Sequence, residues 1–253
     1  MDEQTWSAQA GYGVRFEWGP VGAARLARAG AAALVVVDVL SFTTAVSVAV
    51  ERGTRVYPYP WRDDTAREFA AGHGADLAVG RRQASPRAPW SLSPAALRTA
   101  PFTPRLVLPS PNGSAIAAAA EGLPVYAACL RNATAVARHL HREGYGTPER
   151  PLAVVAAGER WPDGSLRPAV EDLLGAGAVI AALPGSAARL SPEAALAALA
   201  LRADPDPAAT VRSCASGREL ADGGWPQDVA VAVETDASAT VPLLADGAFG
   251  SAS

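Results

Sequence analysis

The chain has 253 residues, of which 49% are hydrophobic and 19% charged, so it can bury a large core and is not intrinsically disordered. Its formal net charge of −3, with the arginines scattered, provides no basic patch for nucleic acid or an anionic membrane, and small molecules are the expected partners. No apolar run reaches the roughly 20 residues that span a bilayer, so we expect a cytoplasmic protein with a single domain over residues 1–253.

Two residue types narrow the chemistry further. All 22 basic residues are arginine, which excludes the lysine-dependent Walker phosphate loop and Schiff-base mechanisms. Cys129 and Cys214 stand alone, so the spacing indicates neither a disulfide framework nor a paired-cysteine metal site.

The first clear element is an apolar run, 34–37, that ends at Asp38. Continuous β-branched residues predict a strand buried on both faces, and the residues after Asp38 predict a helix over 42–52. A strand over 54–59 follows, which would complete a βαβ unit and make the two strands a parallel pair.

The same alternation continues along the chain. Further strands are expected at 12–18, 76–79, 105–108, 124–128, 152–157 and 228–234. Further helices are expected at 23–29, 63–71, 114–121, 132–143 and 169–183, and after Ser191. Three sequence signals mark expected helix starts: capping boxes at Thr65/Glu68 and Ser216/Glu219, and a proline at the first helical position, Pro168.

This order of elements predicts an α/β fold, a three-layer sandwich with a largely parallel central sheet flanked by helices. One segment breaks the alternation: residues 81–104 contain five prolines and are expected to form a long irregular loop, a kind of segment that is often functional.

Three turns share one design, in which a strand is followed by small or polar residues and then a helix. They are Asp38 to Thr44, Ser110 to Ser114, and Gly158 to Asp172. If the three strands are parallel, the turns lie at one edge of the sheet and their polar groups can converge.

The polar residues of these turns indicate a metal and phosphate site. The oxygen donors suited to Mg²⁺ are Asp38, Glu159, Glu171 and Asp172. The groups suited to a phosphate are Asn112, Gly113 and Ser114 at one predicted helix start, and Thr43 and Thr44 at another. The structural alternatives are helix capping for Asp38, dipole stabilisation for Glu171 and Asp172, and an ordinary turn for Asn112-Gly113. Glu159 has no evident capping role.

Five segments in order resemble the 2-phosphosulfolactate phosphatase family. They are VVVDVLSFTTAV, LPSPNGSAIAAAA, CLRNATAVARHL, AAGER followed by VEDLLGAGAVI, and SGRELADGGWPQDVAVAVETDASATVPLL. The resemblance implies a Mg²⁺-dependent phosphatase of α/β fold that acts on 2-phosphosulfolactate as a homodimer. It places the acidic and Asn-Gly positions of the family on Asp38, Asn112, Gly113, Glu159, Glu171 and Asp172.

The chain also departs from the family pattern. Where the family has Asp-Val-Leu-Arg, position 41 is Ser41, and where it has Gly-Glu-Arg the chain has Gly80-Arg81-Arg82. An arginine that could bind a phosphate or sulfonate is thus absent from position 41, and the charge at position 81 is inverted.

The leading hypothesis is metal-assisted hydrolysis of a small phosphomonoester that carries a second anionic group. Asp38 and Glu159 are the candidate catalytic residues, and a phospho-enzyme on Asp38 stays open. Arg81, Arg82 or Arg160 could bind the distal anion. The alternatives are a family member that binds an anionic metabolite without hydrolysing it, and an enzyme for an unrelated phosphate ester.

Overall fold

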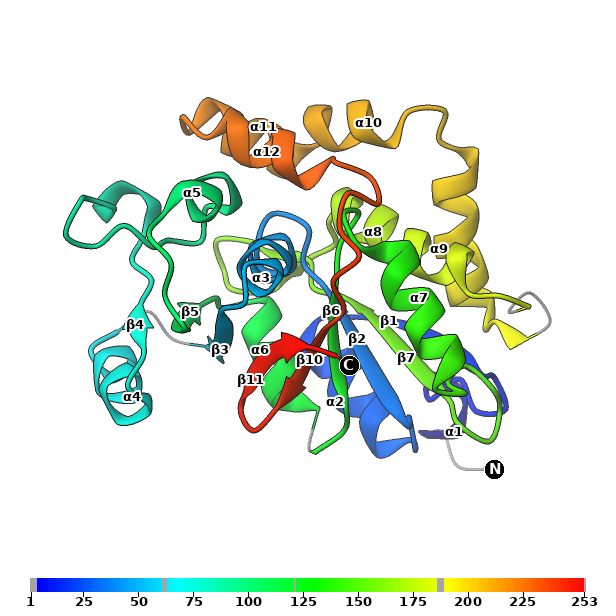
Figure 1. Cartoon of the computed structure of the whole chain (residues 1–253). Coiled ribbons are helices and arrows are strands. Elements are labelled where there is room, and N and C mark those ends of the chain that lie inside the picture. The colour runs from blue at the N-terminus through cyan, green and yellow to red at the C-terminus, as the bar shows by residue number, and fades with distance from the viewer. Residues whose placement is uncertain (1–3, 61–62, 121, 186–188, 253) are drawn as a thin grey trace.

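A nine-stranded sheet forms the centre of the computed structural model, which describes residues 4–60, 63–120, 122–185 and 189–252 (Figure 1). The strand order is β1-β7-β2-β6-β10-β11-β3-β5-β4. The strands are β1 (Val14–Trp18), β2 (Ala33–Val37), β3 (Arg55–Tyr59), β4 (Asp76–Leu77), β5 (Arg105–Pro109), β6 (Val125–Ala128), β7 (Leu152–Ala156), β10 (Pro242–Ala245) and β11 (Ala248–Ser251). A separate short hairpin pairs β8 (Glu159–Arg160) with β9 (Leu166–Arg167).

Parallel ladders join β1, β7, β2 and β6 into one group and β3, β5 and β4 into another. The hairpin β10–β11 lies between the groups and pairs antiparallel with β6 on one side and β3 on the other. The prediction of a largely parallel sheet is confirmed. The prediction that the strands on either side of helix α3 (Phe42–Glu51) form a parallel pair is wrong, because β2 and β3 belong to different groups.

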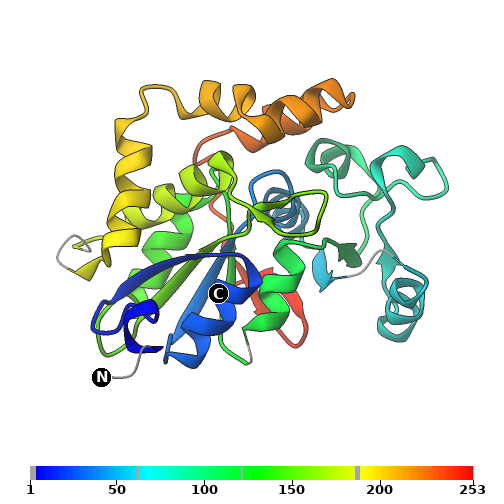
Figure 2. The same cartoon turned by 180° about the vertical axis from the view of Figure 1, so that it is seen from behind.

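The strand β2 is buried on both faces, which explains its unbroken apolar sequence. Leu34 and Val36 pack with residues of α2 (Gly19–Arg28), α3 and α6 (Gly113–Ala119). Val35 and Val37 pack with residues of α7 (Ala133–Arg142), α8 (Val170–Ala182) and α9 (Pro192–Ala203). Figures 1 and 2 show these helices on opposite faces of the sheet, so the predicted three layers are present.

Most of the predicted helices are present within a few residues of their expected ends, including α4 (Thr65–His73), which was predicted over 63–71. The other helices of the described residues are α1 (Gln4–Ser7), α5 (Pro94–Thr99), α10 (Pro207–Ser213), α11 (Ala215–Asp222) and α12 (Pro226–Ala232). The predicted end of the helix over 114–121, at Glu121, lies outside the described residues. Within those residues, no helix is both long and apolar enough to cross a membrane.

The segment predicted as a long irregular loop contains two helical elements, which corrects that prediction. A 3₁₀ turn, η1, spans Arg81–Gln83, and α5 begins at Pro94. Ser93 caps α5 by accepting the backbone N–H of Ala96 at 3.1 Å. A serine followed by proline is a helix-start signal, but the neighbouring prolines obscured it.

The strand predicted over 228–234 is also wrong, because residues Pro226–Ala232 form the helix α12. Valine and alanine alternate here, and both are apolar, so the sequence lacks the polar residues that would separate a period of two from a period of 3.6. The hairpin β10–β11 was not predicted. Its loop, Asp246-Gly247, has positive φ at both residues (50° and 76°), the pattern that Asp-Gly favours in two-residue hairpins.

Three predicted capping features also differ from the structure. Asp64 precedes α4, and the hydroxyl of Thr65 bonds within its own loop instead of capping the helix. Cys214 caps α11, so Ser216 lies inside that helix. The helix α8 begins at Val170 and not at Pro168.

Candidate active site

Asp38 follows β2 directly and is held by backbone groups from two turns. Its Oδ1 accepts the N–H of Phe42 at 2.9 Å, in the first turn of α3. Its Oδ2 accepts the N–H of Gly113 at 3.0 Å, in the turn after β5. Although β2 and β5 belong to different strand groups, their following turns therefore meet at this carboxylate.

The hydroxyls of Thr43 and Thr44, predicted to bind a phosphate, form hydrogen bonds to the backbone of the turn after β2. The Thr43 hydroxyl accepts the N–H of Asp38 at 3.0 Å and donates to its carbonyl at 2.8 Å. The Thr44 hydroxyl donates to the carbonyl of Val39 at 2.8 Å. Both threonines are fully buried, and Ser114 is buried as well.

The turn after β5 needs glycine because its backbone approaches Asp38 so closely. A Cβ at Gly113 would lie 2.9 Å from Asp38 Oδ2 and would also collide with the ring of Phe42. The neighbouring Asn112 donates its Nδ2 to Oε2 of Glu159 at 3.0 Å. This bond links the turn after β5 to the turn after β7.

Asp172, in the first turn of α8, connects the turns that follow β2 and β7. Its Oδ1 accepts the N–H of Val39 at 2.7 Å, and its Oδ2 accepts the N–H of Gly158 at 2.8 Å. The side chain is buried and both oxygens are bonded to backbone, so Asp172 fixes the relative position of the two turns.

Glu171 is the most enclosed acid of the group, at 1% exposed. Its Oε2 accepts the Cys214 thiol at 3.2 Å, whereas its Oε1 has no hydrogen-bond partner among the described residues. A buried oxygen without a donor is uncommon in folded proteins and is a position where a bound cation or water can be expected.

Burial and mutual repulsion change the proton affinity of these acids. Burial raises the pKa of Asp38 to about 6, although its two backbone hydrogen bonds oppose the shift. Burial, followed by the charges of Asp38 and Glu171, raises the pKa of Glu159 to about 7. Burial and the charge of Glu171 also raise the pKa of Asp172 well above its usual range. The turns thus concentrate negative charge at one place.

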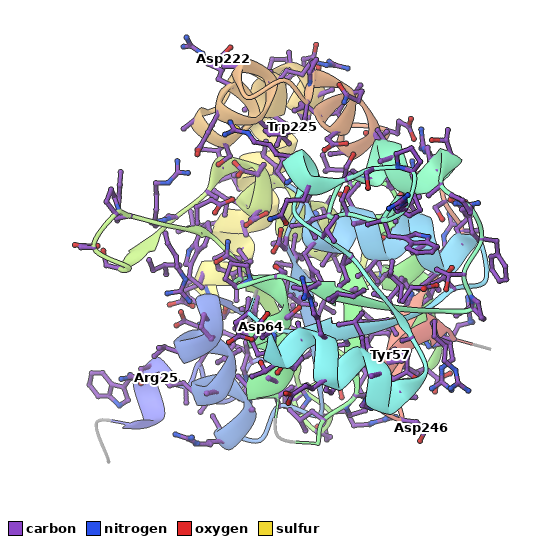
Figure 3. The ribbon with its side chains drawn as sticks, turned by 90° about the vertical axis from the view of Figure 1, so that its left-hand side faces the viewer. Arg25, Tyr57, Asp64, Asp222, Trp225 and Asp246 are labelled. Atoms are coloured by element: carbon purple, nitrogen blue, oxygen red, sulfur yellow. The ribbon has the colours of Figure 1, made fainter. Side chains whose placement is uncertain are left out.

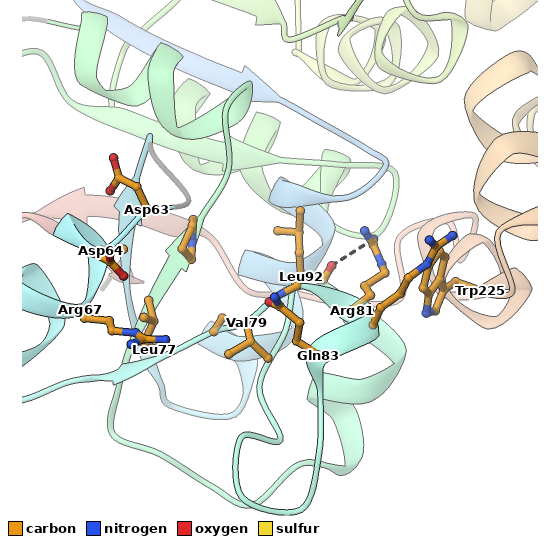
Figure 4. A pocket seen from close by; sticks show the side chains of 14 residues that line it. Asp63, Asp64, Arg67, Leu77, Val79, Arg81, Gln83, Leu92 and Trp225 are labelled. Carbon is orange, nitrogen blue, oxygen red and sulfur yellow. Dashed lines mark hydrogen bonds between the residues drawn. The ribbon is translucent and has the colours of Figure 1, made fainter.

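A cavity of about 710 Å³ opens over this charge. Its lining includes Asp38, Asn112, Glu159, Arg81, Arg82 and Arg160. A second cavity of about 690 Å³ shares Arg81, Arg82, Leu92 and Trp225 with the first (Figure 4). Trp225 lies at the junction of α11 and α12 (Figure 3) and beside Arg81 (Figure 4). The guanidinium carbons of Arg81 and Arg82 are 5.8 and 5.5 Å from its ring centroid.

A sequence model of the 2-phosphosulpholactate phosphatase family matches residues 24–247. The chain belongs to this family. The match covers nearly the whole chain and confirms the resemblance seen in the five sequence segments. Members of the 2-phosphosulpholactate phosphatase family are phosphoric monoester hydrolases, and such chemistry needs acids and anion-binding groups around one cavity.

Ser41 and Arg81, two positions expected from the sequence to depart from the family pattern, lie in contact. Nη2 of Arg81 donates to Oγ of Ser41 at 2.7 Å. A guanidinium group is therefore present beside position 41, although it comes from a different part of the chain. Arg81 also forms an ion pair with Asp228 of α12, with Nε 2.8 Å from Oδ2.

The acid cluster has the donor chemistry that a Mg²⁺ ion prefers. Its carboxylates are hard oxygen donors, the acidic neighbours of Glu159 help to raise its pKa, and Oε1 of Glu171 has no hydrogen-bond partner among the described residues. Among the described residues, no three acidic, histidine or cysteine side chains are arranged to hold a metal ion. Mg²⁺ commonly uses only one or two carboxylates together with a substrate phosphate, so this donor set fits that mode.

The structure brings most of the predicted residues to one place, but not all to the cavity. Asp38, Asn112, Glu159 and the three arginines line it, with Arg160 donating to the carbonyl of Gly164 at 3.0 Å. The other predicted residues do not line the cavity and lie within or behind the turns: Thr43, Thr44, Gly113, Ser114, Glu171 and Asp172. Asp228 and Trp225 were not predicted as site residues from the sequence. For Asp228 one signal was available, an acid in the first turn after Pro226, which starts a helix.

Proposed function

We propose that this chain hydrolyses a small phosphomonoester carrying a second anionic group, 2-phosphosulpholactate or a related compound, in a Mg²⁺-dependent reaction. One observation carries the proposal: Asp38 and Glu159 line the same cavity as Arg81, Arg82 and Arg160. Carboxylates suit metal and proton-transfer roles, and arginines bind phosphate or sulfonate groups through paired hydrogen bonds.

Glu159 is the best candidate for the general base. A base works best when its pKa lies near the working pH, and the pKa of Glu159 is raised to about 7 by burial and by its acidic neighbours. The amide of Asn112 donates to Oε2 at 3.0 Å and so orients the carboxylate. Glu159 would accept a proton from the attacking water.

One or two of the carboxylates of Asp38, Glu159 and Glu171 would hold Mg²⁺ together with the substrate phosphate, and Asp172 would keep their turns in place. When bound, Mg²⁺ would neutralise charge on the phosphoryl oxygens. We leave Thr43, Thr44, Gly113 and Ser114 out of direct substrate contact. The hydroxyls of both threonines and the N–H of Gly113 already have partners within the protein, and Ser114 is buried.

A second candidate function is binding of an anionic metabolite without turnover. Ser41 favours it, because the resemblance seen in the sequence segments implies an arginine at that position. The contact between Arg81 and Ser41 favours hydrolysis instead, since it returns a guanidinium group to the same location. Attack by Asp38 itself, with a phospho-enzyme intermediate, is the alternative chemical route within the first proposal.

A phosphate-release assay tests the proposal. Purified protein would be incubated with a panel of phosphomonoesters that includes 2-phosphosulpholactate, with Mg²⁺ or with EDTA. We expect release only with Mg²⁺, fastest for esters with a second anion, and at least about 100-fold slower for Glu159→Gln. Absence of release from every ester, together with measurable ligand binding, would favour the second candidate.

The homodimer implied by the family resemblance and the cytoplasmic location stay predictions. Light scattering during size-exclusion chromatography tests the first, and fractionation of cells tests the second.

A further inference from the structure

Asp228, near the start of α12, is an acid with no exposed side-chain surface, and both of its oxygens are bonded. Its Oδ2 accepts Nε of Arg81 at 2.8 Å. Its Oδ1 accepts the hydroxyl of Ser93 and the N–H of Ala95, the latter at 3.2 Å. One buried carboxylate therefore joins α12 to the start of α5 and to the arginine beside the cavity.

Arg81 is held at further points and still faces both cavities. Its Nη2 donates to Oγ of Ser41 at 2.7 Å. The same Nη2 donates to the carbonyl of Leu92 at 3.2 Å, a bond that Figure 4 shows. Within the described part of the chain, its Nη1 has no hydrogen-bond partner. The guanidinium is thus fixed along one side, and one of its nitrogens is left available.

A fixed arginine binds an anion better than a mobile one, because the entropy of ordering the long side chain has been lost before the ligand arrives. A carboxylate on Nε also sets the plane of the guanidinium. A free arginine in the same loop would have many orientations, and few of them would face the acids across the cavity.

We propose that Asp228 is a positioning residue which, through Arg81, sets the affinity of the cavity for the anionic groups of the substrate. The identity of that substrate rests on the proposed function, whereas the link between Asp228 and anion binding can be measured without turnover. The competing explanation is that Asp228 only attaches α12 to α5.

A double-mutant cycle separates the two explanations. Inorganic phosphate would be titrated by calorimetry into the wild type, Asp228→Asn, Arg81→Gln and the double variant, at one ionic strength and with Mg²⁺ present. We expect Asp228→Asn to weaken phosphate binding about tenfold in the wild-type background and less than about twofold in the Arg81→Gln background.

Glu234→Gln is the matched control, because Glu234 also pairs with arginines, Arg98 and Arg131, but lines neither cavity. It should alter the melting temperature and leave phosphate affinity unchanged. Equal weakening by Asp228→Asn in both backgrounds, or no weakening in folded protein, would overturn the proposal.

If Asp228→Asn does not fold, the Nε–H signal of Arg81 in ¹⁵N NMR of the wild type decides the question. The signal is assigned by its loss in Arg81→Gln, and we expect slow exchange with water and a shift when phosphate is added. Fast exchange, or no shift on saturation, would contradict the proposal. If Asp228 and Arg81 are coupled in phosphate binding but no phosphomonoester is hydrolysed, this inference is supported and the proposed function is contradicted. If a phosphomonoester is hydrolysed but the two residues are not coupled, the proposed function is supported and this inference is contradicted.

Discussion

Asp38 and Asp172 have the same role toward the backbone but differ in what else they reach. Each carboxylate accepts two backbone N–H groups that belong to the turns of the site. Only Asp38 also lines the cavity. The pair therefore offers a comparison in which support of the backbone is equal and access to substrate is not.

Asparagine at each position should separate the two roles. Asn keeps one acceptor and leaves one backbone N–H unpaired, at a cost of about 1–3 kcal/mol, which relief of the buried charge partly offsets. We expect similar changes in the free energy of unfolding for Asp38→Asn and Asp172→Asn, but a loss of turnover about 100-fold larger for Asp38→Asn. Urea unfolding and phosphate release measure both, and equal losses of turnover would assign Asp38 a structural role only.

Glu159 should make stability depend on pH in metal-free protein. Its pKa is raised from 4.5 to about 7 on folding, so the folded state binds the proton more tightly than the unfolded state. Protonated Glu159 therefore adds to the free energy of unfolding below pH 4.5, and this contribution is lost as the pH rises through about 7. At pH 8, Glu159→Gln should therefore be more stable than the wild type by up to about 3 kcal/mol, with little difference at low pH. Urea unfolding at pH 4.5 and pH 8 in EDTA tests this, and a pH-independent difference would contradict it.

At the scale of elements, the sequence was sufficient where hydrophobic pattern and turn chemistry agreed. The strand β2 was predictable because an unbroken apolar run requires that both faces of the strand are buried. The helix α9 was predictable because Ser191 and Pro192 mark its start. The helix α12 was not, because its valines and alanines suit either period. Pro226 at its start was the one local signal for a helix.

The turn between β5 and α6 should not tolerate a side chain at its glycine. Gly113→Ala would push the turn away from Asp38 and Phe42, and we expect a loss of about 1–3 kcal/mol in the free energy of unfolding together with loss of turnover. Gly72→Ala is the control: it lies in α4 with no atom near its added Cβ, and it should be neutral or stabilising by up to about 1 kcal/mol. Similar unfolding curves for the two variants would contradict the close approach.

At the scale of the whole molecule, the strand order could not be read from the sequence. The alternation of strands and helices predicted a parallel sheet, but not that a hairpin would separate its two groups. Local pattern indicates that a strand exists and which faces are buried, whereas its neighbours depend on contacts between remote segments. The predicted convergence of the three turns is nevertheless present, because the turns after β2, β5 and β7 are joined by direct hydrogen bonds.

Phe249 of β11 joins the two strand groups and should be essential to stability. It is fully buried, pairs with Val56 of β3, and contacts the ring of Phe42 with centroids 6.2 Å apart. We expect Phe249→Ala to lower the free energy of unfolding by about 3–5 kcal/mol. Phe102→Ala, at a phenylalanine that is 59% exposed, is the control and should change it by less than about 1 kcal/mol. Chemical denaturation measures both, and equal effects would contradict the bridging role.

The position of the hairpin also bears on the order in which the protein is made. Residues 242–251 follow every other strand of the sheet in the sequence, so a ribosome completes both strand groups before it makes the segment that joins them. Until then, β6 and β3 each present an unpaired edge. Open edges can pair with other chains. The newly made protein can therefore aggregate through these two edges until β10 and β11 have paired with them.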